Sequence, residues 1–198
     1  MSEPPARPPL QSQGSAPRIG AIIAVIVAAG VVMWLLLKAR DHNGGSGKTV
    51  TTQKATPPVL ADSRLLRRLA DNVQYPVYWA GRISGHKVEL TQTSAGNIFL
   101  RYLAGKARVG DPRPDFLTVG TYPLKDAFTA TKAVAQRPGM VVRKLRGGGI
   151  AMTNPQRRTS VYFSFPRSPV QVEVYDPDPA RAMRLVVSGR VRPIPAGH

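Results

Sequence analysis

Two hydrophobic patterns divide this chain. Residues Ile19 to Leu37 form an uninterrupted run of nineteen residues without a charge, whereas apolar residues elsewhere recur at short intervals between polar ones. At ~1.5 Å per residue such a run spans roughly 28 Å as a helix, close to the ~30 Å hydrocarbon thickness of a bilayer. Trp34 lies near its end, where an indole favours the headgroup layer, and Lys38 follows with a charge that reaches water. The pattern predicts one transmembrane helix over 19–37.

Two other structures compete for this segment. A cleaved signal peptide has a shorter apolar region of ~7–15 residues and a small-x-small cleavage site, whereas Lys38-Ala39-Arg40 follows here. A buried core helix is the second alternative. Residues 1–18 carry five prolines and few apolar residues, and residues 38–59 are rich in Gly, Ser and Thr. We therefore expect a disordered tail before the helix and a flexible linker after it.

From about residue 60 onward the pattern changes to short alternating runs, which predict strands. The predicted strands cover residues 77–79, 87–93, 98–103, 117–122, 140–145, 150–154, 159–165, 170–175 and 190–194. In the second of these, Val88 and Leu90 are expected to point inward, with Lys87 and Glu89 outward. The glycines 147–149 separate two of the runs and predict a hairpin.

Three segments switch to a helical period. They run from Asp62 or Ser63 to about Val73, over 124–136, and from Asp178 to about Val187. The first has leucines on one face and arginines on the other, so it packs either on the domain's sheet or on the membrane. Helices interspersed among hairpin-linked strands predict an α+β domain over 60–195 with a largely antiparallel sheet and two or three helices.

The charge of the chain is strongly positive, at +17. From Leu60 onward, 22 Lys and Arg stand against 9 Asp and Glu. Such a field favours anionic partners such as phospholipid headgroups, wall polymers or nucleic acid, although an arginine-rich composition is also typical of GC-rich bacterial genomes. The chain has no cysteine, which excludes disulfides, thiolate nucleophiles and cysteine-ligated metal sites.

Residues suited to catalysis are few. His86 is the only histidine inside the predicted domain, and it is either a solvated turn residue or a general base that needs a partner. Asp111 with Asp115, and Asp176 with Asp178, alternate with prolines as turns and helix caps do; a loose calcium site is the alternative. We expect no catalytic, metal-binding or cofactor-binding residue and no cofactor.

The predicted hairpin carries a concentration of positive charge. Its cations are Arg143, Lys144, Arg146, Arg157 and Arg158. Glycines allow a backbone to approach a phosphate closely, and cations add long-range attraction. These five residues are therefore a candidate anion-binding site, with a plain hairpin turn between solvated basic flanks as the alternative.

The segments QYPVYWAG, residues 74–81, and VQVEVYDPDPARA, residues 170–182, resemble uncharacterised single-pass membrane proteins of actinobacteria. In those proteins a short proline-rich tail and one anchor precede an α+β domain. The resemblance implies no activity and no functional residue.

The orientation in the membrane follows from two opposing features. Two arginines precede the predicted helix and four cations follow it closely, a count that favours a cytoplasmic domain. Long domains are translocated regardless of charge, and a Gly/Ser/Thr linker suits a domain held off the outer face. We expect a plasma-membrane protein with an extracytoplasmic domain.

The leading functional hypothesis is a membrane-anchored, non-enzymatic binding or assembly module of the bacterial cell envelope. Its partners would be anionic lipid, wall polymer or an envelope protein, and an exported domain would not meet nucleic acid. One alternative is a cytoplasm-facing tether that binds nucleic acid or anionic lipid. Another is an envelope enzyme acting on wall polymer, which requires a cleft that gathers His86 with a carboxylate.

Overall fold

A computed structural model describes residues 54–196 of the chain. The predicted membrane helix, with Ile19, Trp34, Leu37 and Lys38, lies outside these residues, as do the predicted tail and most of the linker. Within 54–196, no helix is both long and apolar enough to cross a bilayer. The described residues form an α+β domain in which an antiparallel sheet of eight strands is combined with three α-helices.

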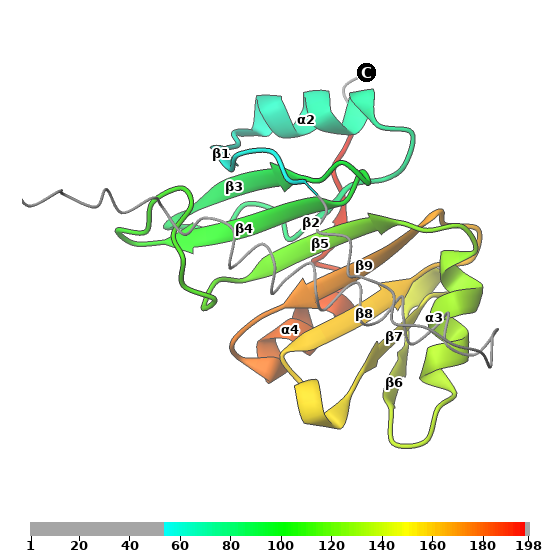
Figure 1. Ribbon diagram of the computed structural model, residues 1–198. Helices are drawn as coiled ribbons and strands as arrows, with labels where there is room; N and C mark the ends of the chain where they lie inside the picture. Colours follow the sequence, from blue (N-terminus) through cyan, green and yellow to red (C-terminus); the bar gives the residue numbers. More distant parts are fainter. Residues whose placement is uncertain (1–53, 197–198) are drawn as a thin grey trace, which may run out of the picture.

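The large sheet has the strand order β1-β3-β4-β5-β9-β8-β7-β6 (Figure 1). Its strands are β1 (Val59–Leu60), β3 (His86–Gln92), β4 (Ile98–Ala104), β5 (Thr118–Pro123), β6 (Val141–Lys144), β7 (Ile150–Thr153), β8 (Ser160–Ser164) and β9 (Val170–Tyr175). The predicted hairpin is confirmed as β6 and β7. β1 begins at Val59, the last residue of the segment expected to be linker, and Ala55 of that segment bridges to Thr93. The sheet therefore begins earlier than the alternation indicates.

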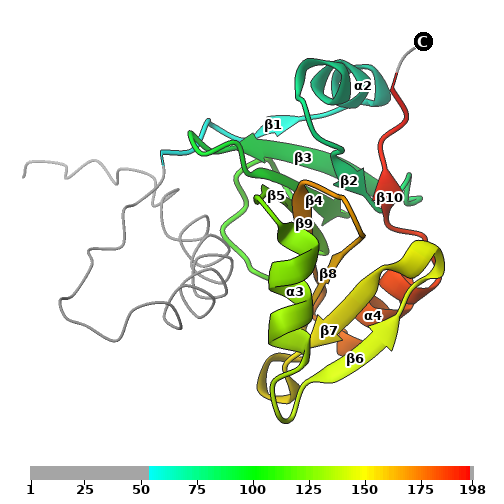
Figure 2. The same cartoon turned by 90° about the vertical axis from the view of Figure 1, so that its right-hand side faces the viewer.

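Layers of different size cover the two faces of this sheet (Figure 2). One face packs against α2 (Ser63–Asn72), α4 (Pro179–Val187), β2 (Tyr78–Trp79) and β10 (Arg192–Pro193), and the other against α3 (Ala127–Ala135). The larger core lies on the α2 and α4 side. Val161 and Phe163 of β8 and Val172 and Val174 of β9 point into it, as their alternation predicts.

The first and third helices begin where their acidic caps predict. Asp62 accepts a hydrogen bond from the backbone N–H of Leu65 at 2.7 Å, and Asp178 accepts one from Ala180 at 2.9 Å. Such bonds satisfy backbone donors that have no partner inside the helix. Leu66 of α2 is buried in the larger core, so the apolar face of this helix packs on the sheet and not on a membrane.

The predicted orientation of Glu89 is wrong. Its side chain is 1 % exposed and pairs with Arg101 of the neighbouring strand at 2.7 Å. The loop between β4 and β5 folds back over this face of the sheet, where the backbone N–H of Gly110 donates to Glu89 at 2.6 Å. Arg101 in turn donates to the carbonyl oxygens of Asp111 and Arg113. A polar position next to apolar ones therefore marks a buried ion pair here and not a solvated face.

Candidate functional site

The structure divides the five cations of the candidate anion site into two groups. Arg143, Lys144 and Arg146 lie at the glycine turn of the β6–β7 hairpin, where Lys144 pairs with Ile150. Arg157 and its neighbour Arg158 follow the other end of β7, in the short 3₁₀ turn before β8. Four strand residues at ~3.3 Å each place roughly 10 Å or more between the groups. Only Arg143, Lys144 and Arg146 therefore lie near the glycine turn.

The two cations of β6 point to opposite faces of the sheet. Arg143 pairs with Ala151, whose side chain belongs to the larger core on the α4 side. Lys144 is the next residue along the strand, so its side chain points to the α3 side. The structure thus removes Lys144 from the group and directs Arg143 toward α4.

Arg143 and Arg146 join further arginines on the outer face of α4. This helix buries Ala182 and Val186 against the sheet, and its opposite side is open to solvent. A shallow hollow of about 760 Å³ lies on that side, between Arg143 and Arg190. We call the arginines and apolar residues that line this hollow and the neighbouring turn the α4 surface: Arg143, Arg146, Arg181, Arg184, Arg190, Met183, Leu185 and Val187. Met183 and Leu185 also pack partly against the larger core.

Most of the positive charge of the α4 surface is uncompensated. The carboxylates that contact its five arginines are those of Asp176, 3.4 Å from Arg181, and Asp178, 3.3 Å from Arg184. Arg190 donates instead to backbone carbonyl oxygens, and Arg146 makes no hydrogen bond or ion pair within the described part of the chain. The Arg184–Asp178 pair is exposed on both sides and contributes little, whereas Asp176 is buried beneath Arg181. Arg143, Arg146 and Arg184 are therefore the guanidinium groups most available to an external anion.

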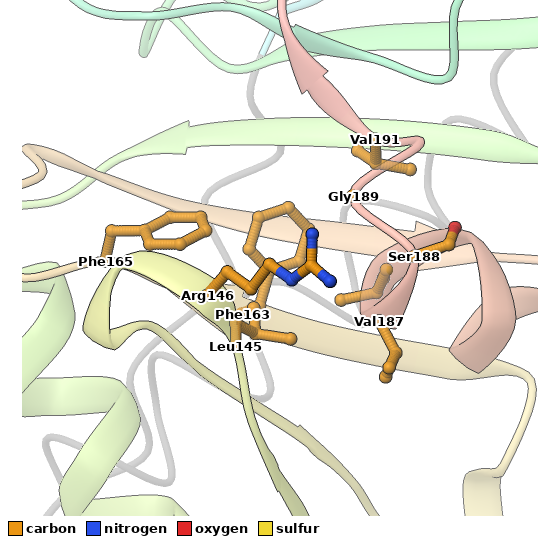
Figure 3. Close-up of a pocket in the computed structure, with 9 residues that line it drawn as sticks. Leu145, Arg146, Phe163, Phe165, Val187, Ser188, Gly189 and Val191 are labelled. Carbon is orange, nitrogen blue, oxygen red and sulfur yellow. The ribbon is translucent and has the colours of Figure 1, made fainter.

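A pocket of about 190 Å³ lies beside the α4 surface, beneath the glycine turn (Figure 3). Leu145, Phe163, Phe165, Val186 and Val191 form its apolar part, and Arg146 and Ser188 add polar atoms to its lining. In Figure 3 the Arg146 side chain extends across the pocket toward Val187 and Ser188. The arrangement offers an apolar recess next to a guanidinium group.

Gly149 explains why this turn contains glycine. A Cβ atom there would lie 2.6 Å from the ring of Phe165, a wall of the pocket. Gly147 and Gly148 have backbone φ values of +76° and +78°, which residues other than glycine rarely adopt. The glycines therefore shape the turn and leave room for Phe165, which accounts for them without a phosphate ligand.

His86 lies in a separate pocket of about 460 Å³ near the start of α2. Its Nδ1 is 2.9 Å from the carbonyl oxygen of Ser84. Asp62 lines the same pocket, but its carboxylate is used to cap α2. Glu89 points to the other face of the sheet. In the described region His86 therefore has no carboxylate partner of the kind a general base needs.

The aspartates next to prolines serve turns and caps. Asp111 accepts from the backbone N–H of Arg113 and forms an ion pair with its side chain at 2.9 Å, and Asp178 caps α4. Hydrogen bonds from Arg113 lower the pKa of Asp111 to about 2. Over residues 54–196, no three His, Asp or Glu side chains are grouped so that they could hold a metal ion.

Glu173 forms a buried polar cluster that the sequence did not indicate. Its carboxylate, 4 % exposed, accepts hydrogen bonds from Tyr122 at 2.6 Å and from Tyr162 and Ser160 at 2.8 Å each. These donors lie 11 to 51 positions away in the sequence, on β5 and β8. Because only the pairing of β9 with both strands brings the four side chains together, no local pattern reveals the cluster.

We expect this cluster to make stability depend on pH. Burial raises the pKa of Glu173, more than the three hydrogen bonds lower it. The folded state therefore binds the proton more tightly than the unfolded state, and the resulting stability is present below the unfolded pKa of about 4.3 and lost as pH rises through the folded pKa. Glu173→Gln, which stays uncharged, should show a smaller fall in the free energy of unfolding above about pH 4.3.

Urea unfolding of both proteins from pH 4 to pH 8 would measure this difference. Asp115→Asn serves as the control, because it removes the same charge from a side chain that is 54 % exposed. Glu173→Gln should change the pH dependence more than this control does. Parallel curves for Glu173→Gln would contradict the prediction.

Comparisons with known proteins return no relative: no protein-family model matches the chain, and no curated protein or solved structure matches it significantly.

Proposed function

We propose that this chain is a membrane-tethered, non-enzymatic binding module of the cell envelope, with an extracytoplasmic domain that binds an anionic partner through the α4 surface. The observation that carries the proposal is the gathering of five arginines around the exposed side of α4, where two carboxylates of the described residues contact them. Phosphate and carboxylate groups are the ligands that guanidinium groups bind most readily.

The distribution of the charges supports this site over other basic parts of the domain. Arg64, Arg67 and Arg68 of α2 are also exposed, but they lie along one helix whose neighbouring leucines pack on the sheet. On the α4 surface, arginines from β6, the glycine turn and α4 itself lie near the exposed Val187 and the half-buried Met183 and Leu185. Long-range attraction acts on both sites, and the α4 surface draws its arginines from several elements rather than from one helix.

A charge-neutralising variant tests the proposal. Arg143→Gln/Arg146→Gln/Arg184→Gln in the full-length chain, held in non-ionic detergent, should bind long-chain inorganic polyphosphate more weakly than the unmodified chain. By analogy with single-stranded nucleic acid, each lost phosphate contact removes about 0.7 from the slope of log K against log salt concentration, so three contacts remove about 2. Fluorescence anisotropy at several salt concentrations measures this slope.

The matched control is Arg64→Gln/Arg67→Gln/Arg68→Gln, which changes the net charge by the same amount on α2. If binding is a response to net charge alone, both variants weaken equally and the α4 surface is not the site. If neither variant weakens binding, the proposed function is wrong.

A further inference from the structure

The α4 surface combines charge with exposed hydrocarbon. Val187 is 48 % exposed, one of the few large apolar side chains of the described region that is open to water. Met183 and Leu185 lie beside it on the same helix, half-buried, and the arginines surround all three. A soluble polyanion makes no favourable contact with these apolar side chains. In a lipid bilayer, the boundary between headgroups and acyl chains accommodates both the apolar side chains and the guanidinium groups.

The predicted tether allows this face to reach the membrane. Residues 38–53 lie between the predicted helix and the first described residue. Sixteen residues reach at most ~55 Å when extended and ~22 Å as a flexible coil, against a radius of gyration of ~14 Å for a domain of this size. The tether enters at β1, at one edge of the sheet, while α4 packs on β8 and β9. The domain has room to turn α4 toward the bilayer.

A tether also raises the effective concentration of the lipid surface. Attachment makes docking an intramolecular event, so contacts too weak to recruit a free domain hold a tethered one. Each arginine near an anionic leaflet adds a favourable electrostatic free energy of binding, and salt weakens it by screening.

We propose that the α4 surface docks on the anionic bilayer in which the chain is anchored, with Val187 at the headgroup boundary and the arginines on lipid phosphates. This inference rests on the proposed function and names its partner.

Because the chain has no cysteine, one introduced cysteine gives a unique label. Val187→Cys and Leu60→Cys replace residues of similar exposure, 48 % and 50 %, on α4 and on β1. Each full-length variant, carrying an environment-sensitive NBD label, would be reconstituted into phosphatidylcholine vesicles with or without about one-third phosphatidylglycerol, plus nitroxide-labelled lipid as the quencher. Docking predicts quenching of the label at position 187 in anionic vesicles only, reversed by 1 M salt, and little quenching at position 60.

Adding Arg143→Gln, Arg146→Gln and Arg184→Gln to the Val187→Cys chain should lower the equilibrium constant for docking by roughly 100-fold and abolish the quenching. Persistence of quenching in this variant, or equal quenching at both labels, would overturn the assignment of α4 as the docking face. If polyphosphate binds through the three arginines while the label at position 187 is never quenched, the bilayer is the wrong partner and the proposed function stands. If both measurements fail, the proposed function fails as well.

Discussion

Arg101→Met is expected to destabilise the folded domain by about 3–5 kcal/mol, because it leaves a buried carboxylate without its cation. Glu89 and Arg101 are 1 % and 9 % exposed at their side chains and lie 2.7 Å apart. After the substitution, Glu89 keeps only the hydrogen bond from Gly110. The loop between β4 and β5 also loses two hydrogen bonds, because Arg101 donates to the carbonyl oxygens of Asp111 and Arg113.

Chemical unfolding measures the loss of stability, and trypsin measures the release of the loop. We expect faster cleavage after Lys106 and Arg108, which lie in that loop. Arg113→Met is the matched control. Like Arg101, this arginine pairs with a carboxylate, that of Asp111, and lies over Phe116, at 5.1 Å from the ring centroid. Unlike Arg101, it has a side chain that is 56 % exposed. Arg113→Met should lower the free energy of unfolding by about 1 kcal/mol or less.

A second variant separates loss of the charge pair from loss of packing. Glu89→Leu combined with Arg101→Met removes both charges, so the double variant should be more stable than Arg101→Met alone. If the double variant is less stable than Arg101→Met, the unpaired Glu89 is not the cause of the destabilisation.

Deletion of residues 19–37 is expected to move the chain from the membrane fraction to the soluble fraction completely. Nineteen residues without a charge match the thickness of the hydrocarbon core, and no helix among residues 54–196 offers a second span. Docking through the α4 surface alone is electrostatic and should not survive extraction with alkaline carbonate. The full-length chain should resist this extraction, and the deletion variant should not.

Immunoblotting of the two fractions measures the distribution, and mass spectrometry of the purified chain provides the control for processing. A mature chain that begins after Lys38 would show a cleaved signal peptide, and extraction of the intact full-length chain by carbonate would show a peripheral protein. Either result would contradict the predicted anchor.

Local patterns were sufficient for most of the secondary structure, although they missed β1. Asp62 and Asp178 marked helix starts because a capping side chain acts within three residues of itself. The alternation of Val161 with Phe163 placed both in the core because side chains in a strand point to opposite faces in turn.

Alternation failed at Glu89 for a reason that lies outside its strand. The pattern reports which residues share a face, but it does not report what covers that face. The loop that follows β4 covers Glu89, and its Gly110 supplies a hydrogen bond. The same limit hid Glu173, whose donors come from two neighbouring strands.

By itself, the sequence determined the positive charge and the α+β class and predicted the anchor, since each depends on composition or on short-range periodicity. The tertiary structure alone decided which cations act together. It separated Arg157 from the glycine turn, turned Lys144 to the opposite face and brought Arg143 beside Arg184, 41 positions further along the chain. Strand pairing and helix packing bring distant residues together, and no pattern within a single segment contains that information.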